Sequence, residues 1–151
     1  QGTLALAETF TSGAIAARIA PLAGAEKVFR RGVVARDPVE VCAAVGLDAS
    51  AATREANVET AEAVARAARQ QTGATHALAV LIALDEGADR IDFGGAICLA
   101  IATGQGVASR RSRIVGGREW VRLGAVEMAL DCLRRCLQGL PMDERIDFEK
   151  V

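Results

Sequence analysis

The chain has few aromatic residues and no excess of either charge. Its 151 residues include four Phe, one Trp and no Tyr, and its formal net charge is -1 at pH 7. Proteins that bind single-stranded nucleic acid usually stack bases on aromatic rings, and proteins that bind duplexes carry a surplus of basic side chains. We therefore expect no nucleic-acid partner and a core built from Ala, Val, Leu and Ile.

Long apolar runs and clusters of metal ligands are also missing. No stretch approaches the ~20 apolar residues of a bilayer span and no charged, apolar leader opens the chain, so we expect no membrane partner. The four cysteines are scattered except for Cys132 and Cys136, and no neighbouring His or Cys completes a zinc set. We interpret them as free, mostly buried thiols of a cytoplasmic protein. The sequence predicts no metal site and no cofactor.

Hydrophobic patterning predicts one α/β domain over residues 1–140, followed by a polar, loosely ordered tail over 141–151. Helices alternate with strands and the last two strands form a hairpin, which is typical of a single layered domain with a mixed β-sheet flanked by helices. Asp37 and Gly73 are predicted to begin and end helices. The expected strands are 3–7, 29–36, 76–84, 94–103 and 106–115, and the expected helices are 12–20, 38–46, 58–71 and 119–137.

The most informative segment is 6–13, Leu-Ala-Glu-Thr-Phe-Thr-Ser-Gly, where an apolar strand gives way to small polar residues before a helix. Unpaired N–H groups at a helix start favour an anion. Two interpretations stay open: Thr11 or Ser12 caps the helix without any ligand, or the cap and Gly13 also hold a phosphate or carboxylate. Glu8 likewise either orients a ligand or accepts backbone N–H groups inside the protein.

Five segments, in order, resemble the CinA C-terminal domain family of bacterial nicotinamide-nucleotide amidohydrolases. The resemblance covers roughly residues 4–137 and implies the family's α/β fold, although the family's first helix has no counterpart here. It also implies hydrolysis of the carboxamide of nicotinamide mononucleotide. The matching segments are 7–13 (family A-E-S-C-T-G-G), 31–35 (G-G-V-V-A), 57–61 (V-S-E-E-T/V-A), 95–100 (G-T-V-[FY]-[IL]-A) and 117–122 (G-[DN]-R-x-x-[VI]-R).

The resemblance implies a Ser nucleophile that a Tyr and a Lys activate, and this chain replaces all three. Thr9 stands at the Ser position, Arg36 at the Tyr position and Val41 at the Lys position, while Pro38 replaces a family Asn. A hydroxyl is a weak nucleophile unless a base takes its proton. The resemblance therefore implies a degenerate site, with Thr9 at the position of the catalytic nucleophile. The ligand-binding residues it implies are Glu8, Thr11, Ser12, Gly13 and Arg36.

Three further features have simpler interpretations. The family's Gly-rich loop corresponds to residues 82–87, whose added carboxylates, Asp85 and Glu86, would repel a phosphate unless the loop points elsewhere. His76, the only histidine, is interpreted as structural. The run of residues 110–113, Arg-Arg-Ser-Arg, is predicted to form an exposed strand face.

Three functions therefore stay open. The favoured one is a weak or inactive family member that binds a nucleotide or small phosphate. The alternatives are an active deamidase with Thr9 as nucleophile, and a structural domain that binds no ligand. Family members often form homo-oligomers, and an Ala-rich helix such as 58–71 can pack against a copy of itself, so a homo-oligomer is expected.

Overall fold

Five strands form one mixed sheet in the computed structural model, which describes residues 1–48, 56–85 and 93–144. Across the sheet the order is β2-β1-β3-β4-β5; β2, β1 and β3 are parallel, and β4 and β5 are each antiparallel to the preceding strand. The predicted fold class is confirmed. The strands are β1 (Leu4–Thr9), β2 (Phe29–Ala35), β3 (His76–Leu84), β4 (Gly94–Thr103) and β5 (Gly106–Val115).

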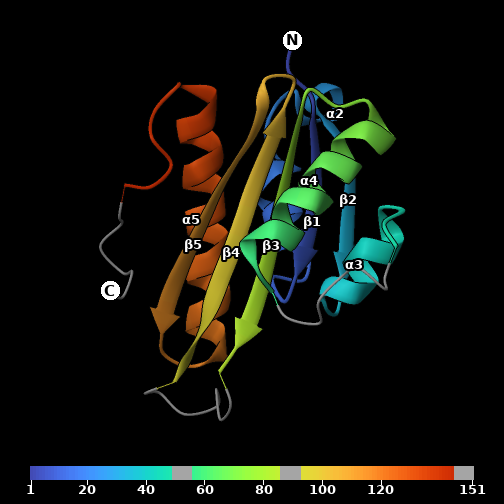
Figure 1. The fold of residues 1–151 in the computed structure, drawn as a ribbon. Helices are drawn as coiled ribbons and strands as arrows, with labels where there is room; N and C mark the ends of the chain where they lie inside the picture. Colours follow the sequence, from blue (N-terminus) through green and yellow to red (C-terminus); the bar gives the residue numbers. More distant parts are fainter. Residues whose placement is uncertain (49–55, 86–92, 145–151) are drawn as a thin grey trace.

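Helices cover both faces of the sheet (Figure 1). One face packs against α1 and α5, and the other against α3 and α4. Periodicity does not reveal the single turn of α2, because four residues are too few to show a helical repeat. The helices are α1 (Ala14–Ile19), α2 (Ala25–Val28), α3 (Pro38–Ala44), α4 (Val58–Thr72) and α5 (Arg118–Leu137).

The two faces of the sheet differ in side-chain size. Successive strand residues point to opposite faces, so in β1 the side chain of Leu6 packs toward α1 and α5 while Ala5 and Ala7 pack toward α4. Alanines on β3 and β4 continue the second face, which lets α4 approach the sheet closely. The apolar α4 residues buried there are Ala61, Val64, Ala65 and Ala68.

Two helix boundaries form as the sequence predicts. The Asp37 carboxylate accepts the N–H of Glu40 at 3.0 Å and begins α3. Gly73 ends α4 with a left-handed φ of 68°, a conformation that glycine adopts without a steric penalty. A side-chain acceptor at Asp37 and the backbone freedom of Gly73 are sufficient to fix the two boundaries.

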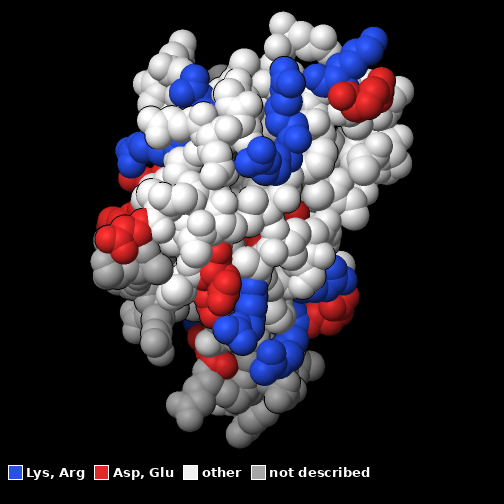
Figure 2. Space-filling model, turned by 90° about the vertical axis from the view of Figure 1, so that its right-hand side faces the viewer, with Lys and Arg blue, Asp and Glu red and all other residues white. Residues whose placement is uncertain are grey.

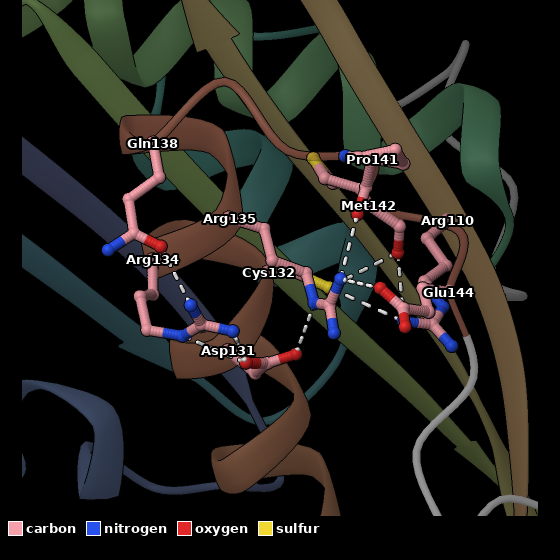
Figure 3. Close-up of polar contacts among 9 residues, drawn as sticks. All are labelled: Arg110, Asp131, Cys132, Arg134, Arg135, Gln138, Pro141, Met142 and Glu144. Atoms are coloured by element: carbon pink, nitrogen blue, oxygen red, sulfur yellow. Dashed lines mark hydrogen bonds and ion pairs between the residues drawn. The ribbon is translucent and has the colours of Figure 1, made fainter.

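The segment after α5 folds back onto α5 and β5 (Figure 3). Met142 is buried in the core, and its carbonyl oxygen accepts a hydrogen bond from Arg110 Nη1 at 2.8 Å. On α5, the Asp131 carboxylate accepts from Arg135 Nε at 2.7 Å, and Arg135 also pairs with Glu144. The chain is thus packed past the predicted start of the tail at Pro141; residues 145–151 lie outside the described part.

The prediction of an exposed face over residues 110–113 is wrong at two positions. Arg110 is 7% exposed and Ser112 is 9% exposed. They lie beside Leu99 and Ile97 of β4, on the face that α5 covers. A run of four polar residues resembles a solvated strand, but α5 and the segment after it close over the face that carries Arg110 and Ser112.

Candidate functional site

The predicted site residues gather where the parallel strands β1, β2 and β3 end. Thr9 closes β1 and pairs in register with Ala35, the last residue of β2. Glu8 pairs with Val34 of β2 and Val80 of β3, so β1 continues two residues beyond the predicted end. The polar residues of the motif therefore begin inside the sheet and continue into the turn that leads to α1.

The Thr9 hydroxyl is part of the sheet. Thr9 is 1% exposed, and its Oγ1 accepts the backbone N–H of Ile82 at 3.0 Å. Backbone pairing between β1 and β3 ends at Glu8 and Val80, so the hydroxyl takes the place of a carbonyl oxygen one step further along. The group at the family's nucleophile position is thus buried and already accepts a hydrogen bond.

Neither the lysine nor the histidine of the described residues lies beside Thr9. Val41 is completely buried in the apolar core against α4. His76 starts β3, at the opposite end of the sheet, where its Nδ1 lies 2.8 Å from Thr75 Oγ1. Lys27 lies in α2, directly before the start of β2. Because β2 runs parallel to β1, Lys27 also lies at the end of the sheet opposite Thr9. His76 and Lys27 could each accept a proton when neutral, but both are therefore remote from the Thr9 hydroxyl.

Glu8 holds the start of α1 from inside the protein. The side chain is 1% exposed. Its Oε1 accepts the N–H of Ile15 at 3.0 Å and the Thr11 hydroxyl at 2.7 Å, and its Oε2 accepts the N–H of Ala16 at 3.2 Å. Of the two interpretations of Glu8, the structure shows the one in which it accepts backbone N–H groups.

The prediction that Thr11 or Ser12 caps the helix is wrong. Gly13 is the N-cap residue of α1 and makes no side-chain cap. The carboxylate of Glu8, which precedes Ile15 by seven residues, supplies the acceptors instead. Short-range cap patterns look one to three residues ahead, so they cannot find a cap that reaches across a turn.

The turn between Glu8 and α1 has an unusual backbone. Phe10, Ser12 and Gly13 have φ values of 53°, 55° and 84°, in the left-handed region that residues other than glycine rarely adopt. The N–H of Thr11 donates to the Thr9 carbonyl, which closes a three-residue turn. Strained backbone of this kind concentrates at functional sites.

Part of this turn is open to solvent. Ser12 is exposed, and within the described residues no acceptor takes the N–H of Ser12 or of Gly13. A Cβ on Gly13 would lie 3.5 Å from Cγ2 of Val34, whose side chain is 52% exposed on the edge strand. Two unpaired amides and an apolar side chain thus adjoin at the surface.

Arg36 follows β2 and is shared between two carboxylates. Its side chain is 83% exposed, and it lies 3.4 Å from Asp37 Oδ2 and 3.9 Å from Glu40 Oε1. The N–H of Glu40, followed by the charge of Arg36, lowers the pKa of Asp37 below its ordinary value. These residues and Val39 line a groove of about 270 Å³, a feature that sequence reasoning missed because it depends on how α3 follows the strand.

The added carboxylate of Asp85 is paired. Arg113 Nη1 donates to Asp85 Oδ1 at 2.9 Å, Nη2 pairs with Oδ2, and the N–H of Gly94 donates to Oδ2 at 3.1 Å. The hydrogen bonds from Arg113 lower the pKa of Asp85. The repulsion predicted from this residue is therefore offset locally. Glu86 and Gly87 of the same predicted loop lie outside the described residues.

Figure 2 shows the β2 edge of the molecule, where basic side chains gather toward the start of the strand and mixed charges toward its end. Between them the visible surface is mostly uncharged. Within the described chain, no helix has the length and apolar character of a membrane span, and no three His, Cys, Asp or Glu residues form a metal-binding group.

Comparison with known proteins assigns this chain to one family. A family model described as the CinA C-terminal domain matches residues 1–137. The chain belongs to the CinA C-terminal domain family. This confirms the family suggested by the five sequence segments.

Relatives of this CinA C-terminal domain are bacterial. A CinA-like protein from Frankia casuarinae is 35% identical over 144 residues, which cover 94% of this chain and 33% of that protein. A CinA-like protein from Geobacter sulfurreducens is 37% identical over 138 residues, covering 89% of this chain and 33% of the relative. The chain thus spans about a third of the length of the curated relatives it matches.

Solved structures share the same architecture. A competence/damage-inducible protein from Agrobacterium tumefaciens has a TM-score of 0.72 and 25% identity, over 91% of this chain and 86% of its own. The competence damage-inducible protein A from Klebsiella pneumoniae has a TM-score of 0.77 and 21% identity, over 91% and 87%. The second likeness shows the fold alone.

Proposed function

We propose that this CinA C-terminal domain binds a pyridine mononucleotide or another small phosphate without appreciably hydrolysing its carboxamide. The observation that carries the proposal is the position of the Thr9 hydroxyl, which is buried and accepts the N–H of Ile82. A hydroxyl is present at the family's nucleophile position, but it accepts a hydrogen bond that extends the β-sheet.

The lack of an activating base supports the inactive half of the proposal. Attack by a hydroxyl on a carboxamide requires an acceptor for its proton. Val41 offers only an apolar side chain at the family's Lys position, and Arg36, at the Tyr position, carries a guanidinium, which donates hydrogen bonds but accepts none. The Thr9 methyl group also crowds any approach to the hydroxyl oxygen.

The exposed turn supports the binding half. The unpaired N–H groups of Ser12 and Gly13 suit the oxygens of a phosphate, in the way that backbone nests bind anions. Arg36 can turn toward the same phosphate at little cost, because exposed ion pairs at 3.4 and 3.9 Å are weak and screened by solvent. Val34 gives an apolar contact for a ring. Glu8 and Thr11 hold the turn in shape.

Titration calorimetry and an ammonia assay with nicotinamide mononucleotide test both halves together. We expect saturable binding, and ammonia release no greater than that of a Thr9→Ala variant. Arg36→Gln should weaken binding about tenfold, the worth of one charge-assisted hydrogen bond. Arg30→Gln is the matched control, since it removes an exposed arginine from the other end of β2.

Two outcomes would overturn the proposal. Ammonia release that Thr9→Ala abolishes would show an active deamidase. Absence of both ammonia release and binding, for nicotinamide mononucleotide and for inorganic phosphate, would instead indicate a structural domain without a ligand.

The homo-oligomer stays a prediction, but α4 is a poor surface for it. The alanine stripe of α4 is buried against the sheet. Large apolar side chains exposed on α5 are Trp120, Leu123 and Leu137. If copies associate, we propose that they do so through α5, and sedimentation velocity of a Leu123→Glu variant would test this.

A further inference from the structure

A second groove, lined in part by arginines, lies at the opposite end of the sheet from Thr9. It has a volume of about 250 Å³ and lies between the last turns of α4 and the β4-β5 hairpin. In the antiparallel pair of β3 and β4, Ala102 lies opposite Ala77 near the start of β3, whereas Gly95 lies opposite Leu84 at its end. The hairpin is therefore far from the strand ends that carry the motif.

Arg69 is anchored at the floor of this groove. Its Nε donates to the Thr75 carbonyl oxygen at 3.2 Å, which fixes the plane of the guanidinium. A Cβ on Gly104 would lie 3.3 Å from Arg69 Nη2, so the glycine leaves the room that the guanidinium uses over the hairpin turn. Among the described residues no carboxylate pairs with Arg69, and no acceptor there takes its terminal Nη groups.

Arg66 lies one turn earlier on the same side of α4. Its Nη2 is 3.7 Å from Glu62 Oε2, and its side chain is 56% exposed. The other oxygen of that carboxylate accepts the Ser109 hydroxyl at 2.6 Å. Of the two guanidinium groups, only that of Arg66 pairs with a carboxylate, and that carboxylate is already engaged by Ser109, so the groove keeps a net positive charge.

Neutral groups complete the groove. Thr103 Oγ1 accepts the N–H of Gln105 at 3.1 Å, which leaves the hydroxyl hydrogen available to a ligand. Gln70 adds a side-chain amide to the same lining. Planar guanidinium forks with neutral donors beside them are the arrangement that binds tetrahedral and planar oxyanions most selectively.

We propose that the groove between α4 and the β4-β5 hairpin binds a small soluble oxyanion, a phosphate monoester or inorganic phosphate, through Arg66 and Arg69. This site is separate from the one proposed at the end of β1. Its ligand is recognised by a negatively charged head group, because the two arginines are the charged residues of the lining.

The test is an amide NMR titration of the whole chain with inorganic phosphate, with chloride adjusted to constant ionic strength. We expect saturable shifts at Gly104 and Gly106. Arg69→Gln and Arg66→Gln should each weaken phosphate binding at least tenfold, and Arg69→Lys should weaken it less than Arg69→Gln. Arg134→Gln, a charge loss on α5, is the matched control and should leave the affinity unchanged.

The spectra also separate this site from the other one, since phosphate at the β1 turn moves Ser12 and Gly13 instead. Arg66→Gln makes the test independent of folding, because Arg66 holds no backbone group among the described residues. Shifts that grow linearly without saturation, or that chloride reproduces, would overturn the proposal. So would an equal loss in Arg134→Gln, or binding to anionic phospholipid vesicles without binding of free phosphate.

Discussion

The hydroxyl of Thr9 accepts the backbone N–H of Ile82 at 3.0 Å, one step past the last backbone pair of β1 and β3. A side chain thus extends the sheet where the main chain turns away. At this one position, sheet pairing and nucleophilic attack would compete for the same oxygen. The predictions below follow from this contact and from the groups around it.

Replacing Thr9 by Val should destabilise the fold. The substitution keeps the shape of the side chain but leaves the Ile82 N–H buried without an acceptor, which costs about 1–3 kcal/mol. Thr9→Ser keeps the oxygen and loses only a methyl group, so it should cost less. Urea denaturation followed by circular dichroism measures both. Equal stability of the two variants would contradict the structural role of the hydroxyl.

Glu8→Gln should loosen the start of α1. An amide NH₂ cannot accept, so one or more of the N–H and O–H donors of Ile15, Ala16 and Thr11 loses its partner, at a cost of about 2–3 kcal/mol. Amide hydrogen exchange at Ile15 and Ala16 should accelerate. Glu59→Gln, an exposed change in the first turn of α4, should alter stability by less than about 0.5 kcal/mol. Similar effects at both positions would refute the capping role.

Restoring the family lysine alone should not restore catalysis. Val41→Lys places an ammonium group at a position with 0% exposure, which should lower the free energy of unfolding by at least about 3 kcal/mol. Val34→Lys, at a side chain that is 52% exposed, is the matched control and should be tolerated. Thermal denaturation compares them. A stable, active Val41→Lys enzyme would show that the core around α3 adapts to the charge.

The pair of Asp85 and Arg113 should make stability depend on acid pH. Arg113 lowers the pKa of Asp85 in the folded state below its ordinary value of 3.8. The unfolded chain then binds the proton more readily, so the contribution of the pair is present above that value and is lost as pH falls through the folded pKa. Below about pH 4, the free energy of unfolding should fall more steeply for the wild type than for Asp85→Asn.

Comparing wild type with Asp85→Asn isolates the effect of Asp85. The other carboxyl groups with a lowered pKa are present in both proteins: Asp37, Glu119 and Asp131. Denaturant titrations at several pH values supply the slopes. Parallel slopes for wild type and Asp85→Asn would contradict the ion pair's contribution.

Long, uniform patterns allowed much of the fold to be predicted. The bounds of β3, β4 and β5 agree with the sequence prediction, because each is a continuous run bounded by Gly or Asp. Short elements were harder to predict from the sequence: α2 has four residues, and β1 extends into the polar Glu8 and Thr9. Strand pairing on both sides of β1 outweighed the polarity of these residues.

The candidate site could be predicted only in part from the sequence, for a related reason. The sequence located the segment and identified the replacements at Arg36 and Val41. It left two roles open for Glu8, and it assigned the wrong cap to α1, because the decisive contacts join residues seven or more positions apart. Likewise, nothing in the run of residues 110–113 indicates that α5 and Met142 cover Arg110.

The sequence by itself determined the family, the fold class and the absence of a lysine at the activating position, since these depend on which residues are present and in what order. Only the tertiary structure decided what the retained polar groups do. Glu8 holds a helix start and Thr9 extends a sheet because folding brings Ile15 and Ile82 next to them. A buried N–H group needs an acceptor, and these two side chains are the acceptors within reach.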